Sequence, residues 1–375
     1  MGNTTTCYTS DATYRNEESA VPPAMQFAIG VIGNGIALLV LKLSAKTHKW
    51  RPFYRLVAAL ALTDGGGILL VYPTVMIRYA VRSFQMPTAL CDYSSFIYTF
   101  TLLASAMIIC SMSIDRFLAI MYPIFYDTNT KYRRVNIMLG VTWISSAVVC
   151  SLHLFGLGDS HSFYPRSWCF IDFSKVQGNS STAILNRANS FLYSFLGLII
   201  IVTIVSLNSI VVITIFRRRF LQKRSKVQNN DSKRDVFNIV FLLTIVVVFA
   251  TLWTPLICVI FAHAVFWMDG DCGTELLVLR LAVTNSIIDP WIYILLRKET
   301  ILSMRRIFFR AVCCKLSYGM NSRSLGSSRK RSCSVTSYRR SDGSQGAPVW
   351  LTDRESPYRT SEEIGIRTSA NEVSV

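Results

Sequence analysis

Several charged side chains stand inside long apolar runs, where an ionisable group is costly and is usually kept for a function. They are Asp64, the neighbours Asp115 and Arg116, Arg280 and Asp289. A guanidinium in apolar surroundings can bind a carboxylate through two parallel hydrogen bonds. An arginine paired with an aspartate can bias an equilibrium between two conformations. These residue types predict anion binding and conformational switching.

Metal binding and enzyme chemistry are not indicated. The 10 cysteines are scattered without a CxxC pair of zinc type, and the 4 histidines show no HExxH spacing. Paired carboxylates or a histidine cluster, which a membrane enzyme would need at the midplane, are also not seen. The sequence therefore predicts no metal site, no cofactor and no enzyme activity.

The composition predicts that these residues are held by membrane helices. Of 375 residues, 51% are hydrophobic and only 16% are charged, which is too apolar for a soluble chain of this length. A helix needs about 20 mostly apolar residues to cross a bilayer. Seven stretches qualify: 22–42, 53–78, 89–121, 135–157, 188–216, 236–266 and 274–296. We expect an all-α membrane protein, a bundle of seven transmembrane helices. The halves show no repeat, which argues against a transporter or channel.

The basic residues predict the orientation of the bundle. The chain has 39 Lys and Arg against 22 Asp and Glu, and the basic residues flank the apolar runs, which indicates a membrane and not nucleic acid. Clusters follow the first, third, fifth and seventh runs, so these loops face the cytoplasm. Residues 1–21 then form an extracellular tail. The glycosylation sequons at Asn3 and Asn179 both fall outside, in agreement with this orientation.

The domain organisation has three parts after the extracellular tail. Residues 22–296 form the helix bundle. Residues 297–314 form the next part: 297–309 are predicted to form a short amphipathic eighth helix on the inner leaflet, and Cys313 and Cys314 follow it. These cysteines are palmitoylation candidates, or else two reduced cytosolic thiols. Residues 315–375 are rich in Ser, Thr, Arg and Gly and are predicted to form a disordered cytoplasmic tail.

A series of motifs, one or two in each run, carries a family resemblance. They are Gly33-Asn34, Asp64, Cys91, Asp115-Arg116-Phe117, Trp143, Trp253-Thr254-Pro255, Asn285-Ser286, and Asp289-Pro290 with Tyr293. In this order they resemble the rhodopsin-like class of G-protein-coupled receptors along residues 22–310. The sequence DRF stands for the usual DRY, and DPWIY for NPxxY.

Within that class the chain is similar to prostanoid receptors. The second outer loop reads YPRSWCF at 164–170, and the seventh run reads LRLAVTNSIIDPWIYILLRK at 279–298. Both look most like receptors for prostaglandin E of the subtype-four-like group. Trp253 departs from most prostanoid receptors, which leaves open a divergent member with a different ligand preference.

The resemblance implies a site for the ligand carboxylate. Arg280 lies ten residues before Pro290, which is about 15 Å along a helix and near the outer mouth. Taken alone, Arg280 is either an anion-binding residue or an arginine that snorkels to headgroups. The resemblance implies that Arg280 binds the acid together with Tyr79 and with Ser167, beside Trp168. Tyr79 is otherwise explained as an interfacial aromatic residue.

Two positions argue against other ligands. Tyr98 stands where amine receptors place an aspartate, so a cationic amine has no counter-ion. Val283 stands where opsins carry the retinal lysine, so a Schiff base is not possible there.

Cysteines on the outer side predict disulfides. Cys91 and Cys169 are both expected outside, and we expect them to tie the second outer loop to the third helix. Cys7 and Cys272 are also outside, and their pairing is left open by spacing alone.

The inner half carries the predicted activation residues. Arg116 is expected to switch between resting and active states, held by Asp115 and, across the bundle, by Asp235. The resemblance adds Trp253, Asp289 and Tyr293 to this set.

A polar cluster is predicted at mid-membrane, formed by Asp64, Ser105 and Asn285. It is similar to the sodium site of the class. A hydrogen-bonded cluster without an ion explains the same residues.

The resemblance implies a multi-pass plasma-membrane receptor for an anionic lipid, prostaglandin E2. It implies coupling to the stimulatory heterotrimeric G protein and a rise in cyclic AMP. Coupling to an inhibitory or calcium-mobilising G protein, or another anionic lipid, is the alternative. Receptor kinases and arrestin are further expected partners, through the Ser/Thr-rich tail, besides the membrane lipids.

Overall fold

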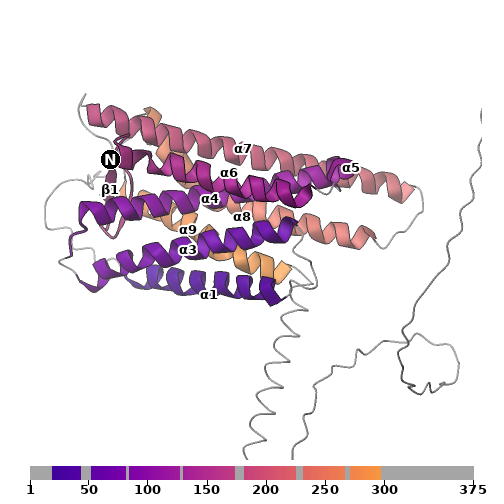
Figure 1. Cartoon of the computed structure of the whole chain (residues 1–375), viewed down its shortest axis with the longest axis horizontal. Coiled ribbons are helices and arrows are strands. Elements are labelled where there is room, and N and C mark those ends of the chain that lie inside the picture. The colour runs from indigo at the N-terminus through magenta and orange to yellow at the C-terminus, as the bar shows by residue number, and fades with distance from the viewer. Residues whose placement is uncertain are drawn as a thin grey trace, which may run out of the picture. The chain divides into compact units, whose positions relative to one another are not determined.

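The computed structural model describes residues 19–43, 52–81, 84–126, 130–173, 181–224, 231–266 and 271–296, without the side chains of 219, 221–242, 295 and 296. Seven long helices lie side by side in this part of the chain (Figure 1). They are α1 Val21–Leu43, α3 Pro52–Ala80, α4 Thr88–Met121, α6 Lys131–Ser151, α7 Ser181–Arg224, α8 Asp231–Phe266 and α9 Cys272–Leu296. Each is long and apolar enough to cross a membrane. The seven predicted spans are therefore confirmed.

Several helices extend past the predicted spans. Helix α6 begins at Lys131, not at 135, and continues as the 3-10 turn η1 Leu152–Phe155. Helix α7 has 44 residues, although only 188–216 was predicted. At about 1.5 Å per residue it is about 66 Å long, twice the hydrocarbon thickness. Hydropathy marks the part of a helix that lies in lipid, and the hydrogen-bonded backbone continues beyond it.

Helix α4 lies at the centre of the bundle, in contact with α3, α6 and α7. In the apolar 18-residue stretch of α4, 72% of the residues are buried, whereas in the corresponding stretch of α7 only 22% are buried. Its buried side chains include Leu103 and Ile108, which pack in one core with Trp253 of α8. A peripheral helix such as α7 instead exposes apolar side chains, for example Val202, to the surrounding lipid.

A glycine brings α3 and α4 together near the middle of the membrane. A Cβ atom at Gly67 would lie 2.1 Å from Oγ1 of Thr101, which is far too close for any side chain. Small residues allow such close approach between membrane helices, where packing replaces the hydrophobic effect. Gly67 thereby sets the distance between the two helices that carry Asp64 and Ser105.

A two-stranded antiparallel hairpin covers one end of the bundle, in addition to the predicted helices. Its strands are β1 Ser160–Phe163 and β2 Trp168–Ile171, and Phe163 pairs with Trp168. All four residues of β2 are buried, because both faces of the strand are covered. Strands of four residues give too short a pattern to be predicted from alternation.

Two short features mark the helix ends. The four-residue helix α5, Pro123–Tyr126, follows α4 at the opposite end from the hairpin (Figure 1). At the start of α9, the Asp271 carboxylate accepts hydrogen bonds from the backbone N–H of Thr274 at 2.9 Å and from its hydroxyl at 2.7 Å. These bonds to Thr274 lower the pKa of Asp271 and cap the helix.

Candidate functional site

The outer half of the bundle contains a small cavity that is partly open. Its walls come from α1, α3, α4, α9 and the hairpin: Pro23, Gln26, Tyr72, Val75, Tyr79, Tyr98, Ser167, Trp168, Leu276, Leu279, Arg280 and Val283. The four residues predicted to contact a ligand carboxylate, Arg280, Tyr79, Ser167 and Trp168, thus lie around one space. Their role as ligand contacts stays a prediction.

Helical spacing explains why these side chains share the cavity. Tyr72, Val75 and Tyr79 follow one another at intervals of three and four residues, so they lie on one face of α3. The residues of α9 keep the same spacing: Leu276, Leu279, Arg280 and Val283. Sequence reasoning named Tyr79 but missed Tyr72, and counting two helical turns back from Tyr79 would have found it.

Gln26 joins three helices at the cavity wall. Its Oε1 accepts a hydrogen bond from the Tyr72 hydroxyl at 2.9 Å. Its Nε2 donates to Oγ1 of Thr284 at 3.2 Å and to the main-chain oxygen of Arg280 at 3.3 Å. Thr284 donates its hydroxyl to the same Arg280 oxygen at 2.6 Å. The helical turn that carries Arg280 is therefore tied to α1 and α3, which sequence reasoning did not anticipate.

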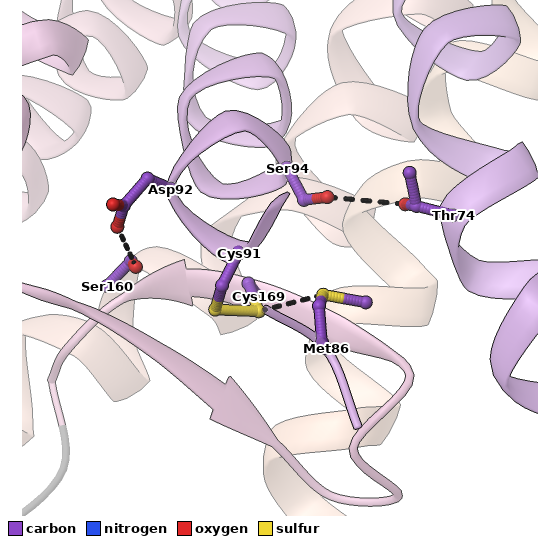
Figure 2. The surroundings of a disulfide bond; sticks show 7 residues. All are labelled: Thr74, Met86, Cys91, Asp92, Ser94, Ser160 and Cys169. Atoms are coloured by element: carbon purple, nitrogen blue, oxygen red, sulfur yellow. Dashed lines mark hydrogen bonds between the residues drawn. A yellow bond between two sulfur atoms is a disulfide. The ribbon is translucent and has the colours of Figure 1, made fainter. Parts of the chain in front are cut away.

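The hairpin is fixed to the bundle by the predicted disulfide. Cys91 of α4 and Cys169 of β2 are bonded, with their Cα atoms 5.3 Å apart (Figure 2). The Ser160 hydroxyl of β1 donates to the Asp92 carboxylate, one residue after Cys91. Both strands are thus attached to the first turns of α4, and this holds Ser167 and Trp168 at the mouth of the cavity.

Aromatic stacking makes the hairpin a rigid cover. The Phe163 ring stacks on Trp168 at 4.8 Å and on Phe173 at 4.5 Å between centroids. The indole Nε1 of Trp168 donates to the main-chain oxygen of Tyr164 at 2.7 Å. Trp168 therefore has its ring held by stacking and its polar atom by a hydrogen bond, so its position at the cavity is fixed. Behind this stack, Phe173 packs edge-on against His263 of α8.

The predicted mid-membrane cluster is formed by two hydrogen-bonded pairs. Ser105 donates to Oδ1 of Asp64 at 2.5 Å, and Nδ2 of Asn285 donates to Oδ2 of Asp289 at 3.0 Å. The two carboxyl groups are buried and interact electrostatically. Oδ2 of Asp64 and Oδ1 of Asp289 have no hydrogen-bond partner in the described part of the chain. Asp289 thus belongs to this cluster, and whether an ion binds there stays a prediction.

Arg116, the predicted switch residue, has two neighbours at the inner end of α4. Its Nη2 lies 3.0 Å from Oδ2 of Asp115, and its guanidinium lies over the ring of Phe53. The Tyr126 hydroxyl donates to the other Asp115 oxygen at 2.9 Å. Burial, and next the negative charge of Asp115, raise the pKa of Tyr126. The side chain of Asp235 lies outside the described residues, so its contact with Arg116 stays a prediction.

The other two predicted activation residues are buried. Trp253 is 1% exposed and stacks on Phe249 at 5.2 Å between ring centroids, and Tyr293 is 3% exposed. Both lie in the helical core, and their part in activation stays a prediction.

Other predicted sites fall on residues outside the described part. These are the sequons at Asn3 and Asn179, the amphipathic helix of residues 297–309, the palmitoylation candidates Cys313 and Cys314, and the tail 315–375. Cys272 takes part in a disulfide. Cys7 lies outside the described residues, so its pairing with Cys272 stays a prediction.

Comparisons with known proteins agree with this architecture. Residues 33–293 match the family described as 7 transmembrane receptor (rhodopsin family). The crystal structure of squid rhodopsin superposes with a TM-score of 0.65 at 20% identity, over 78% of this chain and 85% of that chain. At this identity the likeness shows the fold alone. The family consists of receptors and not enzymes, and its seven apolar helices fit a multi-pass plasma-membrane protein.

Sequence relatives narrow the family. The Prostaglandin E2 receptor EP4 subtype of Rattus norvegicus is 31% identical in an alignment 338 positions long, which covers 78% of this chain and 68% of the relative. The human protein of the same description is 30% identical, over 83% of this chain and 69% of the relative. The Prostacyclin receptor of Mus musculus is 30% identical, over 80% of this chain and 74% of the relative. The chain therefore belongs to the rhodopsin family of seven-transmembrane receptors and, within it, to the prostanoid receptors.

Proposed function

We propose that the protein is a receptor for a prostaglandin, prostaglandin E2 in the first place, that activates the stimulatory G protein and raises cyclic AMP. The chain is about 30% identical both to a prostaglandin E2 receptor and to a prostacyclin receptor. These similar values support the class of ligand more strongly than they support one particular ligand.

The observation that carries this proposal is the position of Arg280. Its side chain lines the outer cavity together with the hydroxyl-bearing residues Tyr79 and Ser167, at a place closed over by Trp168. A guanidinium and two hydroxyl groups are suitable donors for one carboxylate. Apolar residues such as Val75 and Leu279 form other parts of the wall and suit a hydrocarbon chain. A lipid with a carboxylate at one end satisfies both parts of the cavity.

Ligand binding would be transmitted to the inner half of the bundle. Outward movement of α8 at the inner side would open a basic cavity between α4, α7 and α8, into which a G protein can insert. Exposed arginines at the inner end of α7, Arg217 and Arg218, supply part of that positive charge. Receptor kinases and arrestin are proposed partners of the Ser/Thr-rich tail.

The test is a cyclic AMP assay in cells that express the full chain, titrated with each natural prostaglandin. We expect prostaglandin E2 to raise cyclic AMP at the lowest concentration. Competition binding with the same panel measures affinity independently of coupling. A panel that neither binds nor signals would reject the prostaglandin assignment. Binding without a rise in cyclic AMP would instead indicate an inhibitory or calcium-mobilising G protein, which separate assays of those pathways detect.

A further inference from the structure

A second cavity lies deeper in the bundle and shares part of its wall with the outer one. Tyr72, Tyr98 and Val283 line both cavities, so the two spaces meet at these three side chains. The deeper walls are mostly apolar, with Ile68, Leu102 and similar side chains. A ligand that enters from the mouth must pass the two tyrosines to reach this space.

The two tyrosines differ in the state of their hydroxyl groups. The Tyr72 hydroxyl is bonded to Gln26, as described above. Tyr98 is only 7% exposed and lines both cavities, and none of the hydrogen bonds found in the described part of the chain involves its hydroxyl. Once a ligand fills the cavity and excludes water, a hydroxyl without a partner is unfavourable, and most such groups in proteins are satisfied. The Tyr98 hydroxyl is therefore available at the cavity wall to a polar group of a ligand.

The chemistry of that partner follows from the surroundings. The carboxylate of a lipid acid is expected at Arg280, and no described residue at the junction supplies a second positive charge for another anion. A charged group at the junction would be desolvated without a counter-ion, which is costly. A neutral oxygen can exchange a hydrogen bond with the phenol at no such cost. An unsubstituted hydrocarbon chain would leave the hydroxyl unsatisfied.

We propose that Tyr98 is a specificity-determining residue whose hydroxyl binds a neutral oxygen, a hydroxyl or carbonyl group, carried partway along the carbon skeleton of the ligand. This inference rests on the proposed function, in which Arg280 holds the carboxylate. It adds to the carboxylate contact a second polar contact, between Tyr98 and one of the three neutral oxygens of prostaglandin E2.

Tyr72 provides a matched control. It is a tyrosine in the same cavity walls, and Tyr72→Phe removes the same atom as Tyr98→Phe. The Tyr72 hydroxyl is already bonded within the protein, so its loss disturbs the wall and not a ligand bond. We expect Tyr72→Phe to change the affinity for all ligands by a common factor.

The experiment is competition binding against tritiated prostaglandin E2 on membranes that contain the full-length wild-type, Tyr98→Phe or Tyr72→Phe receptor at matched surface level. The competitors are prostaglandin E2 and its three analogues that each lack one neutral oxygen: the ring carbonyl, the ring hydroxyl or the side-chain hydroxyl. On the wild type, one analogue should bind roughly 10-fold more weakly than the parent through loss of the Tyr98 bond. The affinity of Tyr98→Phe for prostaglandin E2 should fall by about the same factor, whereas its affinity for that analogue should not change. The two ligands should then bind the variant equally well.

Two results would overturn the inference. The first is that Tyr98→Phe alters no affinity, which would mean that the hydroxyl contacts water or nothing in the complex. The second is that Tyr98→Phe weakens the parent and all three analogues by one factor, as Tyr72→Phe is expected to do, which would make Tyr98 a packing residue. The methyl ester of prostaglandin E2 distinguishes failure of the proposed function from failure of this inference alone. If the wild type does not bind prostaglandin E2, or binds acid and ester equally, the carboxylate site is wrong and this inference fails with it.

Discussion

The guanidinium of Arg116 lies over the ring of Phe53, with Cζ 4.3 Å from the ring centroid. Arg116 is thus held from two sides, by the Asp115 carboxylate on its own helix and by an aromatic face on α3. Phe53 is 3% exposed and the Arg116 side chain is 25% exposed, so the pair is partly shielded from water. A shielded cation over an aromatic ring is stabilised by up to about 2 kcal/mol.

We expect Phe53→Leu to raise ligand-independent signalling, because Arg116 loses roughly 0.5–2 kcal/mol of stabilisation in the resting arrangement. The measurement is cyclic AMP without ligand at matched surface expression. Phe53→Tyr is the control, since it keeps the ring face and should keep basal signalling near the wild-type level. Equal basal activity in all three receptors would show that Asp115 alone restrains Arg116.

A second restraint on Arg116 is predicted to come from α8. Asp235→Asn should raise basal signalling, because the amide removes the negative charge and leaves Arg116 in place. The same assay without ligand measures it, and Asp231→Asn, at the start of the same helix, is the matched control. If both variants behave as wild type, Asp235 is a solvated acid at a helix start.

The disulfide makes a separate prediction for the outer side. Cys91→Ser or Cys169→Ser should abolish prostaglandin binding or surface expression, because the hairpin that positions Ser167 and Trp168 loses its covalent attachment to α4. Cys258→Ser is the control, since this cysteine is free and lies on the exposed face of α8. Wild-type affinity in either single variant at a normal surface level would contradict the assigned role of the disulfide.

The site could be predicted from the sequence only where a local motif marks it. Arg280, Tyr79 and Ser167 stand in segments whose local pattern identifies them, and the structure places all three on one cavity. No local motif identifies Gln26 or Tyr98 as a residue of the site. Whether Gln26 meets Tyr72 depends on the rotation of α1 against α3, and hydropathy fixes the length of a membrane helix but not its rotation. The hairpin was missed for another reason, since β2 is an apolar segment of only four residues.

The ligand class is decided by Arg280. Arg280→Ala should weaken prostaglandin E2 binding by roughly 2–5 kcal/mol, the usual loss when one member of a buried charge pair is removed. Arg280→Lys should recover only part of this, because an ammonium group keeps the charge but not the two parallel hydrogen bonds. Competition binding measures both variants. Arg187→Ala is the control, because Arg187 is another arginine at the outer end of the bundle but does not line the cavity. Its Nε donates to the main-chain oxygen of Ala264 at 2.5 Å.

Comparison of the acid with its neutral methyl ester isolates the contact at Arg280. The ester should bind the wild type weakly and be nearly indifferent to Arg280→Ala, because it has no charge to lose. The four affinities form a double-mutant cycle across protein and ligand, which separates the pairwise interaction from any effect on folding. If acid and ester instead lost affinity equally, the Arg280 side chain would have a structural role and the cavity would have no anion site.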